Sequence, residues 1–194
     1  KAIGEKSGKT IEFENLPFDS LIPALQGGTI DAAISGMTIT EEREETVDFS
    51  DPYFNAGLAI AVQDSTADIK TLKDLEGKRI AVQIGTTGAD TANEVPDAEV
   101  TTFENAPLAL QELANGNVDA VINDAPATLD AISTGNLPNI TVVGELLTEE
   151  SYGIAMPDGS ENVEIVNTAL AEIKADGTYA ELYRKWFGAE PPTE

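Results

Sequence analysis

The chain has 194 residues, with 35 acidic and 11 basic side chains and a formal net charge of −24 at pH 7. It contains no cysteine and no histidine, which excludes disulfides and thiolate metal sites and removes the commonest general base of hydrolases. The negative charge is spread along the whole chain, so it would repel nucleic acid and anionic membrane surfaces, and it suits a protein that lives at high salt.

Short helices and strands are predicted to alternate in the first part of the chain. We expect a helix ending near Lys6, a strand over 10–13, a helix capped by Asp19, a strand over 29–34, an acidic helical turn over 41–46 and an irregular segment over 48–53. The strand over 29–34 should end just before Ser35 and Gly36, which leaves the amides and hydroxyls beyond it without a ladder partner. Such groups can bind a polar ligand. The longest apolar runs, such as 57–62, fall far short of the ~20 residues of a membrane span.

The middle of the chain repeats the same alternation. We predict strands over 58–62, 79–83, 99–103, 118–122 and 140–143, and helices over 71–75, from the 85–88 turn to about 94, over 106–114 and over 126–133. A linking stretch should then reach Tyr152. Two helices are expected within 161–187, separated at Asp176-Gly177, with Thr178 and Glu181 forming a capping box at the second one.

An internal repeat indicates two related halves. Residues 24–36 read A-L-Q-G-G-T-I-D-A-A-I-S-G, and residues 112–124, which lie 88 positions further on, read E-L-A-N-G-N-V-D-A-V-I-N-D. Both copies follow a predicted strand and helix, so the chain is expected to form two α/β lobes. Ligands of such sheets bind outside the carboxyl ends of the strands, where Gly36 and Asp124 fall. Asp31 and Asp119, present in both copies, are expected to be structural.

Three groups have the chemistry to hold a zwitterion. Arg43 is the one cation in a strongly acidic neighbourhood, and its planar fork of donors suits a carboxylate, although it could equally balance a helix start rich in glutamate. The G-T-T-G turn over 85–88 offers backbone amides at a helix start. Asp124 could hold an ammonium group, which would explain a carboxylate in that place. Phe18 could cover an aliphatic side chain or simply be core.

The order of motifs resembles a known family over essentially the whole chain. I-S-G-M-T-I-T-E-E-R, V-D-F-S-D-P-Y, F-D-S-L-I-P-A-L-Q, V-Q-I-G-T-T-G, N-D-A-P and Y-A-E-L-Y-R-K-W-F-G are similar to the polar amino acid-binding proteins of ABC importers, solute-binding family 3. This resemblance implies a two-lobed α/β fold of the type II periplasmic-binding-protein kind, each lobe with a mostly parallel sheet flanked by helices.

The resemblance also implies the roles of the site residues. Arg43 would clamp the α-carboxylate of an amino acid, assisted by the amides of Thr38 and of the Thr87 region, and Phe18 would stack on its side chain. The carbonyl of Gly36, the Thr38 hydroxyl and Asp124 would hold the α-ammonium group. The full set of expected ligand-binding residues is Phe18, Gly36, Met37, Thr38, Arg43, Gln83, Thr86, Thr87, Asn123 and Asp124.

Two of these positions bear on the identity of the ligand. Family members that sense glutamine often have lysine where this chain has Gln83, and histidine where it has Asn123. Both departures argue against glutamine, and we expect an amino acid with a polar or basic side chain. Acidic amino acids should bind worst, because the formal net charge of the protein is −24 and repels anions.

The function implied by the resemblance is periplasmic or extracellular binding of an amino acid, with or without a membrane anchor, and its delivery to an ABC transporter permease. The expected lobes are 1–55 with 152–194, and 56–151, with hinge crossings near 53–57 and 148–152. No enzyme activity, cofactor or metal is expected. The alternatives are an amino acid-sensing domain of a receptor or channel with the same fold and, third, a dehydratase-like enzyme.

The resemblance further includes an N-terminal strand that precedes the first helix, and the sequence has no counterpart to it. The repeat agrees, because the strand over 79–83 has no equivalent in the first half. We therefore expect the first strand of lobe one to be missing from the sequence, and a monomer unless a neighbouring chain donates a strand.

Overall fold

The computed structural model describes residues 1–135, 137 and 139–192 and divides the chain into two units. Unit 1 comprises Lys1–Asn15, Ala24–Tyr53 and Gly153–Glu194, and unit 2 comprises Leu16–Pro23 and Phe54–Tyr152. The segment Leu16–Pro23 thus goes with unit 2. The expected lobes, 1–55 with 152–194 and 56–151, stay a prediction.

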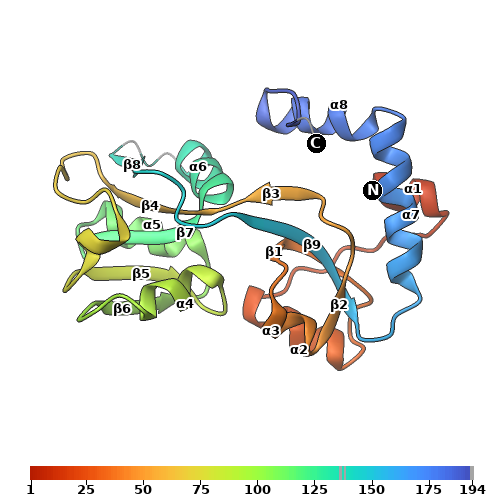
Figure 1. Cartoon of the computed structure of the whole chain (residues 1–194), viewed down its shortest axis with the longest axis horizontal. Coiled ribbons are helices and arrows are strands. Elements are labelled where there is room, and N and C mark those ends of the chain that lie inside the picture. The colour runs from red at the N-terminus through yellow and green to blue at the C-terminus, as the bar shows by residue number, and fades with distance from the viewer. Residues whose placement is uncertain (136, 138, 193–194) are drawn as a thin grey trace. The chain divides into compact units, whose positions relative to one another are not determined.

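Unit 1 is built around the second half of a long strand (Figure 1). Strand β9 (Glu150–Pro157) lies between β1 (Ala33–Thr38) and β2 (Val47–Phe49), and it pairs antiparallel with β2. The helices of this unit are α1 (Ala2–Ser7), α3 (Glu41–Glu44), α7 (Asn162–Ala175) and α8 (Thr178–Phe187). The end of α2 (Leu21–Gln26), from Ala24 onward, also belongs to it.

The core of unit 1 follows from the helical spacing in α7. Val166, Leu170 and Ile173 recur on one face of that helix and pack against Ile154 and Met156 of β9. Helix α1 lies beside α7 (Figure 1).

Unit 2 contains a five-stranded sheet in the order β6-β5-β7-β4-β8. These strands are β4 (Leu58–Gln63), β5 (Arg79–Gln83), β6 (Glu99–Phe103), β7 (Ala120–Asp124) and β8 (Ile140–Val143). The other elements are the 3₁₀ helices η1 (Phe18–Ser20) and η2 (Leu72–Leu75), the helices α4 (Thr87–Asn93), α5 (Ala106–Ala114) and α6 (Ala125–Thr134), and β3 (Phe54–Ala56), which pairs antiparallel with the start of β9.

Both faces of the inner strands β4, β5 and β7 are buried, which explains their nearly continuous apolar sequences. In β5, Ile80 and Val82 belong to one core cluster, together with Ala92 of α4. Ala81 belongs to the other cluster, with Leu110 and Leu113 of α5. The alternation of neighbouring residues between the two clusters is the period of two expected of a strand.

The sheet of unit 2 is mixed, so the expectation of mostly parallel sheets was wrong in this detail. Strand β5 pairs in parallel with β6 and β7, whereas β4 pairs antiparallel with β7 and β8. The reason lies in the connections. Helix α4 connects β5 to β6 and α5 connects β6 to β7, as parallel strands require, whereas β4 follows β3 and precedes β5 in the chain but lies between β7 and β8 in the sheet.

Several predicted elements of unit 1 also differ from the structure. Residues 10–13 form no strand, because no described strand provides them with a ladder partner. The strand expected over 29–34 lies instead at Ala33–Thr38, and Ile34 is 56 % exposed. The predicted linking stretch before Tyr152 already contains the start of β9. The capping box was wrong, since the N-cap of α8 is Gly177 in the left-handed conformation.

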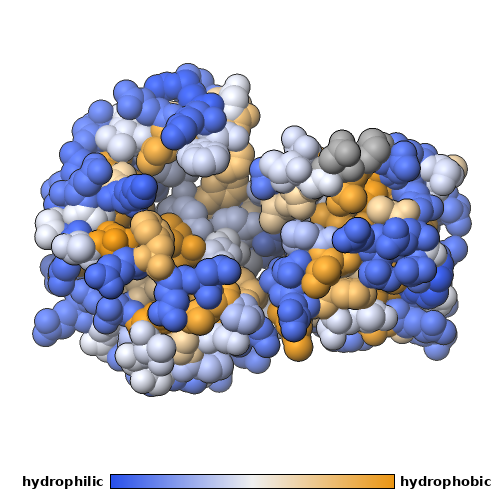
Figure 2. All heavy atoms as spheres, turned by 180° about the vertical axis from the view of Figure 1, so that it is seen from behind, coloured by the Kyte–Doolittle hydropathy of each residue, from blue (hydrophilic) through white to orange (hydrophobic). Residues whose placement is uncertain are grey.

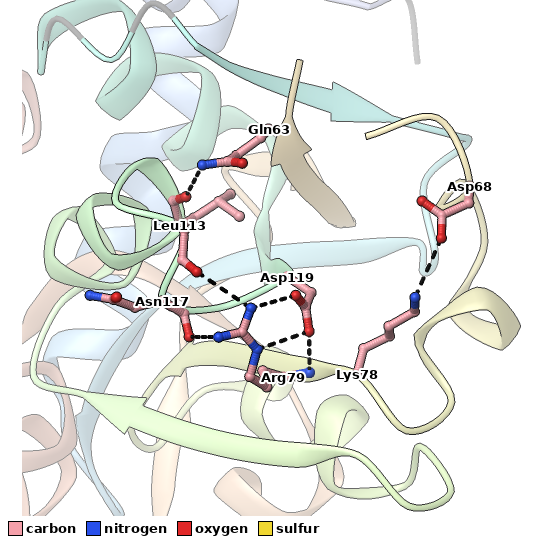
Figure 3. A network of polar contacts seen from close by, with 8 residues as sticks. Gln63, Asp68, Lys78, Arg79, Leu113, Asn117 and Asp119 are labelled. Atoms are coloured by element: carbon pink, nitrogen blue, oxygen red, sulfur yellow. Dashed lines mark hydrogen bonds and ion pairs between the residues drawn. The ribbon is translucent and has the colours of Figure 1, made fainter. Parts of the chain in front are cut away.

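Asp119 has a structural role at the start of β5 (Figure 3). Its Oδ2 accepts hydrogen bonds from the backbone N–H of Arg79 at 2.9 Å and from Nε at 3.2 Å, and its Oδ1 accepts from Nη2 at 2.7 Å. The Arg79 guanidinium also donates to the carbonyl of Asn117 at 2.7 Å. Hydrogen bonding to Arg79 lowers the pKa of the Asp119 carboxyl below its usual value of 3.8.

Hydrophilic residues cover most of the face seen in Figure 2, as expected from 35 acidic side chains. Within the described part of the chain, none of the helices combines the length and the apolar character needed to cross a bilayer.

Candidate functional site

Arg43 is held at the end of β1 by two local bonds. Its backbone N–H donates to the Oγ1 of Thr40, the N-cap of α3, at 3.2 Å. Its Nη1 donates to the carbonyl of Thr38 at 2.7 Å. A guanidinium is a rigid planar fork of donors, so one short bond to a fixed carbonyl orients the whole plane. The half-buried side chain is therefore positioned by β1.

The residues expected near Arg43 lie within β1 and not beyond its end, which corrects the predicted strand boundary. Gly36 has a φ of 61°, so the strand bends there in a way that favours glycine. Its backbone N–H donates to the hydroxyl of Tyr53 at 3.3 Å. Met37 and Thr38 are buried, at 1 % and 5 % exposure.

Tyr53 was not among the predicted site residues. Its hydroxyl accepts from Gly36, and its carbonyl accepts from the hydroxyl of Tyr179 at 2.8 Å. Burial raises the pKa of the Tyr53 hydroxyl. The sequence offered no signal for this contact, because it joins the bend in β1 to a residue that precedes β3.

In unit 2, the G-T-T-G turn begins α4 as predicted. Thr86 is the N-cap: its Oγ1 accepts from the backbone N–H of Ala89 at 3.2 Å and donates to the carbonyl of Gln83 at 2.8 Å. A Cβ placed on Gly85 would lie 3.2 Å from the Cβ of Asp19. The turn therefore packs against η1, which begins at Phe18.

The same turn also packs against β7. A Cβ on Gly88 would lie 2.9 Å from the carbonyl oxygen of Ile122, so only glycine allows this approach without a shift of the backbone. Ile122 stands two residues before Asp124, which ends β7 and is half-buried. Unit 2 thus brings together three segments that the sequence singled out: the start of η1, the turn over 85–88 and the end of β7.

The two amide side chains in this region have structural partners. Asn123 is buried, and its Nδ2 donates to Oγ1 of Thr128 on α6 at 3.1 Å. The Nε2 of Gln83 donates to the carbonyl of Glu104 at 3.3 Å. Their contact with a ligand stays a prediction.

Glu150 is a second residue that sequence reasoning missed. Its Oε2 accepts from Oγ1 of Thr87 at 3.1 Å, and its Oε1 accepts from Oγ1 of Thr148 at 3.0 Å. In turn, the backbone N–H of Leu58 donates to Oγ1 of Thr148 at 2.9 Å. Glu150 lies in what the sequence presented as a linking stretch, so no pattern pointed to it.

The comparisons with known proteins agree on one family. Residues 1–189 match the family described as "Bacterial extracellular solute-binding proteins, family 3". The chain is 37 % identical to ABC transporter arginine-binding protein 1 of Escherichia coli (strain K12), over 96 % of this chain and 78 % of that protein. It is 38 % identical to ABC transporter glutamine-binding protein GlnH of Bacillus subtilis (strain 168), over 94 % of this chain and 67 % of that protein.

A solved structure shows the same fold. The structure of an ancestral arginine-binding protein bound to arginine has a TM-score of 0.91 and 47 % sequence identity, and the match covers 97 % of this chain and 85 % of the other. The chain therefore belongs to the bacterial extracellular solute-binding proteins of family 3, with the α/β fold of type II periplasmic binding proteins, and it is a binding protein and not an enzyme.

Proposed function

We propose that the chain binds an L-amino acid with a polar or basic side chain outside the cytoplasm and delivers it to the permease of an ABC importer. The family supports this, as do the relatives named for arginine and glutamine. The observation that carries the proposal is the 2.7 Å bond from Arg43 to the Thr38 carbonyl, because it presents an oriented guanidinium in an otherwise acidic segment. A guanidinium fixed in this way suits a carboxylate held by two parallel hydrogen bonds.

Each unit contributes groups of its own to the ligand in this proposal. In unit 1, Arg43 holds the α-carboxylate, assisted by Thr38. In unit 2, the Asp124 carboxylate holds the α-ammonium group, and Phe18 covers the side chain. The remaining residues proposed to contact the ligand are Gly36, Met37, Gln83, Thr86, Thr87 and Asn123.

The transport role comprises three further proposals. The chain crosses between units at Asn15–Leu16, Pro23–Ala24, Tyr53–Phe54 and Tyr152–Gly153. We propose the last two crossings as the hinge of a ligand-induced closure. The protein acts as a monomer that docks on the permease. It works outside the cell membrane, where an anchor would keep it near the permease.

The test is calorimetry with the proteinogenic amino acids, followed by two variants. Arg43→Ala should weaken binding of the preferred amino acid by about 100-fold or more, because its desolvated carboxylate loses a charged partner. Asp124→Asn should cost a similar factor. Arg184→Ala and Asp130→Asn, which change exposed residues of α8 and α6, serve as matched controls with unchanged affinity. Binding of no amino acid, or unchanged affinity in both site variants, contradicts the proposal.

A further inference from the structure

Strand β1 bends at Gly36, one of the residues proposed to contact the ligand. The φ of 61° at this residue lies in the left-handed region, within a strand that is otherwise extended. Glycine adopts this conformation without strain, but it also has more backbone freedom than any other residue. A bend at glycine therefore keeps one direction only where a neighbouring group restrains it.

The side chain of Tyr53 supplies such a restraint. Its hydroxyl accepts a hydrogen bond from the backbone N–H of Gly36 at 3.3 Å, across 17 positions of the sequence. Because the peptide unit is planar, this bond fixes the plane that precedes Gly36, from which the two dihedral angles of Gly36 lead to its own carbonyl. A rotation of that plane would therefore displace the carbonyl as well.

Tyr53 is itself held in place by unit 1. Its ring packs against the core cluster that contains Ile154 and Leu170. Its backbone carbonyl accepts from the hydroxyl of Tyr179 on α8 at 2.8 Å. Three residues earlier, the backbone N–H of Ser50 donates to the carbonyl of Ile154 at 2.9 Å, and the hydroxyl of Ser50 accepts from the N–H of Ile154 at 2.9 Å. The Tyr53 hydroxyl is therefore a fixed acceptor for the bend in β1.

We propose that Tyr53 is a positioning residue of the amino acid site: its hydroxyl fixes the bend at Gly36 and so the direction in which the Gly36 carbonyl faces the ligand. This inference rests on the proposed function. A carbonyl oxygen accepts hydrogen bonds, and the donor that every amino acid brings is its α-ammonium group. Holding the carbonyl in place before the ligand arrives lowers the ordering cost of binding. In this proposal Tyr53 acts through Gly36 and not by contact with the ligand.

The experiment removes one hydroxyl group. Tyr53→Phe keeps the ring in the core and the backbone carbonyl beside Tyr179, so it tests the hydroxyl. The bond to Gly36 is at the long end of the usual range, so we expect calorimetry to show affinity lowered by about 3-fold to 10-fold. The factor should be the same for every proteinogenic amino acid that the unaltered protein binds, because all of them carry the α-ammonium group. Amide exchange measured by NMR should be faster for the Gly36 N–H in this variant than in the unaltered protein.

Tyr179→Phe is the matched control. It makes the same chemical change in a second tyrosine that packs against the same core cluster, and it removes the 2.8 Å bond to the Tyr53 carbonyl. It leaves the Gly36 N–H with its acceptor. It should therefore lower the melting temperature at least as much as Tyr53→Phe does, and change affinity by less than about 2-fold.

The outcomes separate positioning from general stability. Equal loss of affinity in the two variants would show only a loss of stability and would overturn the inference, as would unchanged affinity in Tyr53→Phe. Exchange of the Gly36 N–H at the rate of an unprotected amide in the unaltered protein would overturn it even where a variant does not fold. Absence of binding to every amino acid would instead refute the proposed function, and this inference with it.

Discussion

Replacing Thr148 with valine should destabilise unit 2 strongly for so small a change. Valine has nearly the shape of threonine but lacks the hydroxyl, so two bonds are lost: the one accepted from the Leu58 N–H at 2.9 Å and the one donated to Glu150 at 3.0 Å. Leu58 is 1 % exposed, so its N–H would be left buried without this acceptor, at a cost of about 1 to 3 kcal/mol. Loss of the bond to the carboxylate adds about 1 kcal/mol.

The total of about 2 to 4 kcal/mol should be measured as a change in the free energy of unfolding in urea. In thermal unfolding it corresponds to a decrease in melting temperature of about 4 to 16 °C for a chain of this length. Thr148→Ser is the matched control, because it keeps the hydroxyl and loses only one methyl group, at a cost of about 1 kcal/mol or less. If both variants unfold at the same urea concentration, the hydroxyl does not hold these elements together and the reasoning is refuted.

Two further predictions concern the packing and the charge of unit 2. Gly88→Ala places a Cβ 2.9 Å from the backbone oxygen of Ile122, so α4 must move by about half an ångström. We expect the free energy of unfolding in urea to fall by about 1 to 2 kcal/mol and amino acid binding to weaken. Unchanged values for both would contradict this packing. Asp119→Asn should cost about 1 kcal/mol at neutral pH. Because Arg79 lowers the pKa of the folded Asp119 carboxyl below 3.8, its stabilising effect is present above about pH 4 and is lost as the pH falls through the folded value. The difference between the variant and the unaltered protein should therefore shrink in acid, and a difference that is constant with pH would argue against the ion pair.

The strands of unit 2 were predictable because local pattern and burial agree there. The predicted ranges 79–83, 99–103 and 140–143 coincide with β5, β6 and β8. Each is short and rich in β-branched residues, and each ends at residues that favour turns or helix starts. In unit 1 the pattern was misleading. Strand β9 begins with polar residues and owes its existence to pairing with β2 and β3, which only the folded chain provides.

Candidate site residues could be proposed from the sequence where a residue type has one evident use. Arg43 and Asp124 stood out because an isolated cation in an acidic segment and a carboxylate at a strand end call for partners. Glu150 did not stand out, because it is one of many acidic residues. Its hydrogen bond with Thr87 joins residues 63 positions apart in the sequence, and it forms only because β9 lies beside the start of α4 in the folded chain. The second bond, from Thr148, depends in turn on the start of β4.

The two residues proposed to hold the ends of the ligand differ in the secondary structure that carries them. Asp124 ends β7, a strand with a hydrogen-bonded neighbour on each side in β5 and β4. Arg43 lies in α3, a helix of four residues. Amide hydrogens in an interior strand exchange with solvent only through a cooperative opening of the sheet, whereas those in a single helical turn exchange through local fraying. Deuterium uptake at Ile122 should thus report the opening of unit 2 as a whole, while uptake in α3 reports the mobility of the carboxylate clamp alone, and a bound ligand should slow the second far more than the first.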